Sequence, residues 1–87
     1  MIETQLNRGT PLPFTMELTD GSRIVSIGDI EACFQHLTDR QREASHWNIA
    51  VRMHANAMAE PSYLKAATMS LQTAFALDGL LAGWMQT

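Results

Sequence analysis

Apolar residues recur at helical spacing between Ser45 and Glu60, and this segment has the most regular pattern in the chain. Counted from Trp47, the positions follow the i, i+3, i+4, i+7 spacing of one helix face: Trp47, Ala50, Val51, His54, Ala57 and Met58. Pro61 comes next, and the residue before a proline is disfavoured in helical geometry. The pattern therefore predicts a helix over residues 43–59 that forms the floor of the core.

An alternating pattern earlier in the chain predicts a β-hairpin with strands at about 14–18 and 22–25. Polar residues separate the apolar residues of the first strand, which are Phe14, Met16 and Leu18. Asp20-Gly21 favours a two-residue turn, because both residue types tolerate positive φ. A turn of this length places Met16 opposite Val25 and leaves Ile24 on the other face of the hairpin.

Two further helices are predicted, over residues 27–38 and 62–78. Ser26 to Asp29 has the S-x-x-D form of a helix start. The first helix carries an apolar stripe with Cys33 beside it: Ile27, Ile30, Phe34 and Leu37. The last helix carries a second stripe: Leu64, Ala67, Leu71, Ala74 and Phe75. Gly79 fits a left-handed C-cap, and we expect the apolar tail after it, with Leu80, Leu81 and Trp84, to fold back onto the core.

The resulting order is β-β-α-α-α, which is an α+β domain with a hairpin packed on a small helical layer. Residues 1–13 contain two closely spaced prolines, so we expect an extended or loose lead-in, with residues 14–87 as a single domain. A chain of 87 residues can bury one modest core.

Charge and cysteine content narrow the class of protein. The chain has six basic and nine acidic residues, a net charge of -3, whereas nucleic-acid-binding domains usually carry a basic patch. Three arginines, Arg40, Arg42 and Arg52, lie near the start of the central helix, and we interpret them as a solvated face among acids. One cysteine and an N-terminus without an apolar run predict a cytoplasmic protein without nucleic-acid or membrane partners.

Several short motifs resemble those of the domain-of-unknown-function 982 family, small proteins of rhizobia and other α-proteobacteria. They are Pro13-Phe14-Thr15-Met16, Val25-Ser26 with Ala32, Trp47-x-x-Ala50, and Ala74-Phe75 leading to Asp78-Gly79-Leu80. The resemblance covers roughly residues 13–81 and implies a bacterial protein of this fold class. It departs from the family at Thr38-Asp39, where a Trp-Pro pair is expected. The family has no established activity, so the resemblance implies no site residues.

Candidate chemistry is sparse. Cys33 and His36 are one helical turn apart, and His46 and His54 lie two turns apart, but no second closely spaced ligand pair completes a zinc site. His54 lies within an apolar stripe, where a neutral core histidine is the simpler interpretation and a ligand-binding or pH-sensing group the alternative. Acid–base pairs such as Glu31 with His36 or Asp39 with His46 can be drawn. No catalytic motif is present, so we predict a non-enzymatic protein without catalytic, metal or cofactor residues.

Protein association is the best-supported function at this stage. Apolar residues outside the core stripes form a candidate interaction surface: Ile24, Ile49, Met53, Tyr63, Met69 and Leu77. We therefore predict a protein-interaction or self-associating module, whose partner is either another, unidentified protein or a second copy of the chain in a homodimer. The alternative is a small-molecule-binding or regulatory domain with a pocket near Trp47 and His54.

Overall fold

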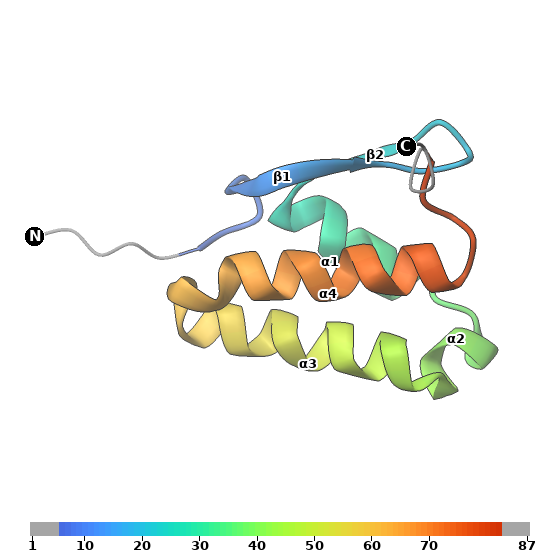
Figure 1. Cartoon of the computed structure of the whole chain (residues 1–87). Coiled ribbons are helices and arrows are strands. Elements are labelled where there is room, and N and C mark those ends of the chain that lie inside the picture. Colours follow the sequence, from blue (N-terminus) through green and yellow to red (C-terminus); the bar gives the residue numbers. More distant parts are fainter. Residues whose placement is uncertain (1–5, 83–87) are drawn as a thin grey trace, which may run out of the picture.

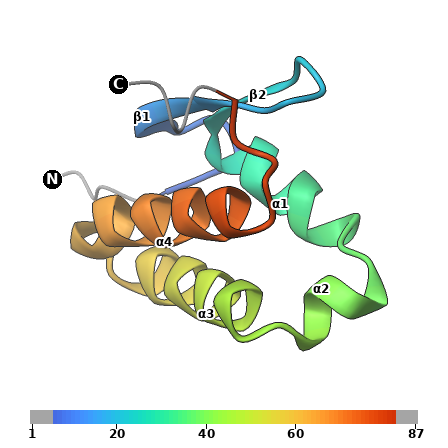
Figure 2. The ribbon, with the colours of Figure 1, turned by 45° about the vertical axis from the view of Figure 1, so that its right-hand side comes forward.

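A two-stranded antiparallel hairpin covers one side of a helical layer in the computed structural model, which describes residues 6–82 (Figure 1). The elements in chain order are β1 (Pro11–Glu17), β2 (Arg23–Ser26), α1 (Ile27–Gln35), α2 (Asp39–Glu43), α3 (Ser45–Ala59), a 3₁₀ turn (Pro61–Tyr63) and α4 (Leu64–Leu77). Helices α3 and α4 run antiparallel, and α4 lies between α3 and the hairpin (Figures 1 and 2). The predicted α+β class, with a hairpin packed on helices, is confirmed.

The hairpin register differs by one residue from the prediction. Met16 pairs with Ile24 rather than with Val25, because the loop has three residues instead of two. The Gly21 N–H donates to the Leu18 carbonyl at 2.9 Å, and Gly21 itself adopts φ +91°, the left-handed conformation that such loops require. A one-residue shift moves a side chain to the other face of a strand, so Ile24 enters the core and Val25 is exposed.

The N-terminal segment of the described chain is hydrogen-bonded to the start of α1. β1 begins at Pro11, three residues before the predicted start, so residues 11–13 of the predicted lead-in belong to the strand. The Thr10 and Arg8 carbonyls accept from the Ile27 and Gly28 N–H groups at 3.0 and 2.8 Å, which satisfies two free donors at the start of α1. The segment before the strand therefore contributes to the folded domain.

Residues 80–82 fold back against the end of β1, as predicted for the tail. Thr19 N–H donates to the Leu80 carbonyl, and Ala82 N–H donates to the Glu17 carbonyl, both at 2.8 Å. Near its end, β1 thus has neighbours on both sides (Figure 1). Trp84 lies outside the described residues.

The connector between α1 and α3 forms a helix of its own. α1 ends at Gln35, three residues earlier than predicted, and Thr38 caps the five-residue α2. Ala44 is extended (φ -78°, ψ 137°), so the predicted helix over 43–59 begins at Ser45. The local reason for α2 is a reciprocal capping box, in which the Thr38 hydroxyl accepts from Gln41 N–H and the Gln41 side chain accepts from Thr38 N–H.

α4 ends in the predicted glycine C-cap. Gly79 has φ +73°, its N–H donates to the Ala76 carbonyl, and Leu80 N–H donates to the Phe75 carbonyl at 2.8 Å. These two bonds form a Schellman motif. It turns the chain sharply after Asp78 and directs residues 80–82 toward β1.

The core lies between the hairpin, α1, α3 and α4. Its buried apolar cluster consists of Leu12, Met16, Ile24, Ile27, Ile30, Trp47, Ala50, Leu71, Ala74 and Phe75. The stripe of α3 is narrower than predicted, because Val51 and Met58 at its border are exposed. Thr68 is a fully buried polar residue that the apolar pattern did not indicate, and its hydroxyl donates to the Leu64 carbonyl at 2.8 Å.

Candidate functional site

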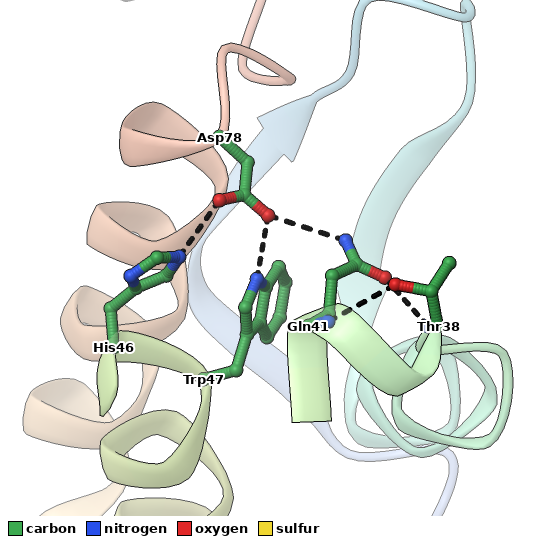
Figure 3. Close-up of polar contacts among 5 residues, drawn as sticks. All are labelled: Thr38, Gln41, His46, Trp47 and Asp78. Carbon is green, nitrogen blue, oxygen red and sulfur yellow. Dashed lines mark hydrogen bonds and ion pairs between the residues drawn. The ribbon is translucent and has the colours of Figure 1, made fainter. Parts of the chain in front are cut away.

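The carboxylate of Asp78 gathers three donors at the end of α4 (Figure 3). Trp47 Nε1–H donates to Oδ2 at 2.7 Å, and His46 Nε2 lies 2.8 Å from Oδ1. The Gln41 side-chain amide donates to Oδ2 at 3.3 Å. One side chain therefore connects α2, α3 and the C-terminal turn of α4, and we call these four residues the Asp78 network.

Electrostatics favour the ionised form of Asp78. Partial burial raises the pKa of this carboxyl, but hydrogen bonds from Trp47, His46 and Gln41 outweigh burial and hold the pKa below its usual value. A carboxylate at a helix C-terminus is disfavoured by the helix dipole. The donors of the Asp78 network therefore offset both burial and the helix dipole and favour the carboxylate form at this position.

An open groove of about 500 Å³ borders the Asp78 network. Its lining consists of Thr38, Arg40, Gln41, Ala44, His46, Asp78 and Leu80. Its polar side chains are largely engaged: the Thr38 hydroxyl caps α2, the Gln41 amide bridges Thr38 and Asp78, and both Asp78 oxygens accept bonds. We therefore interpret the Asp78 network as a structural connection between helices rather than as reactive chemistry.

His54 belongs to a second polar cluster on another side of α3. Its Nε2 lies 3.3 Å from Glu31 Oε2, and Arg8 forms an ion pair with the other Glu31 oxygen at 2.9 Å. The ring packs edge-on against Phe34, with centroids 5.5 Å apart. Its Nδ1 is buried without a hydrogen-bond partner among the described residues.

This arrangement matches a core histidine with one bonded nitrogen. The His54 side chain is 12% exposed, and it is not among the lining residues of three grooves on the described part of the chain. Trp47, in contrast, is among the lining residues of two grooves. The structure therefore does not bring Trp47 and His54 together in one pocket.

The acid–base pairs drawn from the sequence are replaced by others. Glu31 pairs with His54 rather than His36, and His46 pairs with Asp78 rather than Asp39. His36 Nδ1 lies 2.8 Å from the Ala32 carbonyl of its own helix. The partners in each observed pair are more than twenty positions apart in the sequence. Local spacing therefore could not predict which acid meets which histidine.

Cys33 and His36 line a third groove beneath the hairpin loop. Burial raises the pKa of the Cys33 thiol to about 11, which keeps it in the unreactive protonated form at neutral pH. Within residues 6–82, no three His, Cys, Asp or Glu side chains are grouped as a metal site would require. The predicted absence of metal and cofactor sites remains a prediction for the whole chain.

The candidate interaction residues divide into exposed and buried ones. Ile24 is only 6% exposed and belongs to the core, so it is removed from this surface; the one-residue register shift is the reason. Met53 is half-buried. The remaining four are at least half exposed: Ile49, Tyr63, Met69 and Leu77.

From Met69 to Leu77, the outward face of α4 carries no charge; Lys65, four positions before Met69, lies on the same face at the first turn. Met69, Thr73 and Leu77 follow one another at four-residue spacing, and all three are exposed. Lys65 is the only charged residue in α4. Surface helices normally place charged residues opposite the core, so this face has the character of a contact surface.

Ile49 and Met53 extend this face onto α3. They lie three and seven positions after His46, which reaches Asp78 at the end of α4, so all three are on the side of α3 that borders α4. Leu77 directly precedes Asp78. We call Ile49, Met53, Met69, Thr73 and Leu77 the α3–α4 face.

The Asp78 network is the feature that sequence reasoning missed. The sequence indicates Asp78 only as the residue before a glycine cap and as part of the Asp78-Gly79-Leu80 motif. The available signal was Trp47, because a buried indole N–H usually has a hydrogen-bond partner. The sequence did not indicate which acceptor would meet it.

Comparison with protein-family models, curated proteins and solved structures finds no match to this chain. Membership of the domain-of-unknown-function 982 family therefore stays a prediction. None of the helices among residues 6–82 combines the length and the apolar character that a bilayer crossing requires.

Proposed function

We propose that the protein acts through protein–protein contact and forms a homodimer through the α3–α4 face. The observation that carries the proposal is the exposed side of α4 from Met69 to Leu77, which carries no charge, with Leu77 at 64% and Met69 at 50% exposure. Covering such side chains removes apolar area from water, which stabilises an association by roughly 25 cal/mol for each Å². A monomer gains nothing from keeping them exposed.

The distribution of charge favours α4 as the place where two copies meet. The chain carries a net charge of -3, so two copies repel each other over most of their surface. On α4, Lys65 is the only charge and lies at the first turn. When two α4 helices pair antiparallel about a two-fold axis, the two Lys65 side chains lie at opposite ends, about 18 Å apart along the axis.

The size of the contact requires both helices. A 14-residue helix is about 21 Å long, and one face of it is smaller than the roughly 800 Å² that each partner contributes to a stable interface. The adjoining side of α3, with Ile49 and Met53, enlarges the surface. We therefore propose an interface formed by four helices, two from each copy.

The test is sedimentation velocity of the full chain over a range of concentrations. We expect dimers in the parent protein and at least about a tenfold weaker association in Leu77→Lys or Met69→Lys, since a charge is then desolvated at the interface. Leu77 occupies the last turn of α4, where a positive charge is favourable, so this variant should fold. Val25→Lys places the same charge on an exposed apolar residue of β2, away from the α3–α4 face, and should dimerise normally.

Two outcomes would reject the proposal. One is a parent protein that stays monomeric at all concentrations. The other is a dimer that Val25→Lys weakens as much as Leu77→Lys, with both variants folded by circular dichroism, because the contact would then lie elsewhere.

A further inference from the structure

A second apolar groove, of about 350 Å³, lies between the C-terminal half of α1, α2 and the first turns of α3. Figure 2 shows how the ribbon of α2 joins the end of α1 to the start of α3. Its lining consists of Phe34, Leu37, Arg42, Trp47, Asn48 and Val51. Two aromatic and two aliphatic side chains thus adjoin one cation and one amide, the composition typical of small-ligand sites.

Arg42 is held in place and has no acidic partner among residues 6–82. Its Nε donates to the Leu37 carbonyl at 3.2 Å, which anchors the guanidinium at the end of α1. None of the ion pairs formed among residues 6–82 includes Arg42. The Nη groups of an anchored guanidinium form a planar pair of donors that matches a carboxylate.

We propose that this groove binds a small carboxylic acid with an apolar body, either aromatic or branched alkyl. The carboxylate pairs with Arg42, and the body covers Val51 and fills the space between Phe34 and Leu37. Asn48 supplies an amide at the same rim. A neutral ligand would leave the cation without a partner, and an inorganic anion would leave the apolar walls exposed to water.

The groove is separate from the α3–α4 face. Val51 and Ile49 are two positions apart on α3, which places them about 160° apart around the helix axis. Val51 lines the groove, whereas Ile49 lies on the side that borders α4. Ligand binding and self-association can therefore be tested independently, and failure of one leaves the other intact.

The test is an NMR titration of the ¹⁵N-labelled full chain with 4-phenylbutyrate, using 4-phenylbutyramide as the matched neutral probe. We expect saturable shifts of the Trp47 indole N–H and of the Asn48 and Val51 amides. The acid should bind at least about tenfold more tightly than the amide, because a charge-assisted hydrogen bond is lost in the amide. Shifts on the α3–α4 face should be absent.

Two substitutions test which arginine binds the carboxylate of the ligand. Arg42→Gln should weaken 4-phenylbutyrate binding at least about tenfold, whereas Arg40→Gln, on the same helix but lining the other groove, should bind like the parent protein. Dispersed spectra confirm that both variants are folded. Equal affinity for acid and amide, unchanged binding in Arg42→Gln, or shifts confined to the α3–α4 face would each overturn the proposal.

Discussion

At the scale of single residues, the buried indole of Trp47 determines the most consequential polar contact in the molecule. Its ring is 1% exposed and packs edge-on against Phe75, so its N–H is inaccessible to water and needs an internal acceptor. Asp78 supplies that acceptor from a position 31 residues away. A buried indole can be predicted from an apolar stripe, but its partner depends on how α3 and α4 pack.

Removal of the Asp78 carboxylate should lower the free energy of unfolding by about 2–4 kcal/mol, since Trp47 N–H loses its acceptor and the bond to His46 is lost. Chemical denaturation of Asp78→Ala measures this change. Asp39→Ala, an exposed acid in the first turn of α2, serves as control and should cost less than about 1 kcal/mol.

A double-mutant cycle with Trp47→Phe separates the energy of the Trp47–Asp78 hydrogen bond from other effects of each substitution on stability. The effects of Asp78→Ala and Trp47→Phe should not add, because both remove the same hydrogen bond. Full additivity would mean that the bond contributes nothing to stability.

At the scale of elements, the hairpin illustrates what local sequence determines. The alternation of residues and the Asp20-Gly21 pair predicted the existence of both strands, although β1 begins three residues earlier than expected. They did not fix the register, because Asp-Gly is compatible with loops of two and three residues, and Ile24 and Val25 are both apolar. Only packing of Ile24 against the helices distinguishes the two registers.

The left-handed Gly21 provides a test of the three-residue loop. Gly21→Ala should destabilise the protein by about 1 kcal/mol, because an alanine in this conformation is strained. Added bulk is not the cause, since a Cβ at Gly21 would meet no atom within 4 Å. Gly21→Asn should cost less, since asparagine tolerates positive φ. Thermal unfolding compares the two variants, and equal losses would argue against the conformational explanation.

Some helix boundaries are set by neighbouring residues, and others depend on contacts with distant parts of the chain. The Ser26 start of α1 and the Gly79 end of α4 are both predicted by local signals. The separation of α2 from α3 at Ala44 is not, since alanine has no preference for breaking a helix. The Asp78 network, which joins Gln41 of α2 to α4, favours this arrangement.

At the scale of the whole molecule, stability should be greatest between about pH 4 and pH 9. The pKa of Asp78 is depressed in the folded state, so its contribution is present above the unfolded value of 3.8 and is lost as pH falls below it. The pKa of Cys33 is raised to about 11 from 9.0, so its contribution is present below pH 9 and is lost as pH rises toward 11.

Denaturation at a series of pH values measures the loss of stability in acid and in alkali, which we call the acidic and the alkaline limb of the profile. Cys33→Ala should reduce the loss of stability in alkali and leave the acidic limb unchanged. Asp78→Asn should reduce the loss of stability in acid alone. The opposite assignment, or two unchanged limbs, would contradict the proposed origins. Asp20, whose hydrogen bonds with Ser22 lower its pKa, adds to the acidic limb in both variants.

β1 acquires its second neighbour only when residues 80–82 are in place. The bonds from Thr19 and Ala82 connect segments more than sixty positions apart, and closing so long a loop is slow, so this pairing should be among the last to form. Until then, one edge of β1 presents unpaired N–H and C=O groups that another chain can extend into an aggregate. Pro11 and Pro13, which lack N–H groups, limit such growth at the other end of the strand.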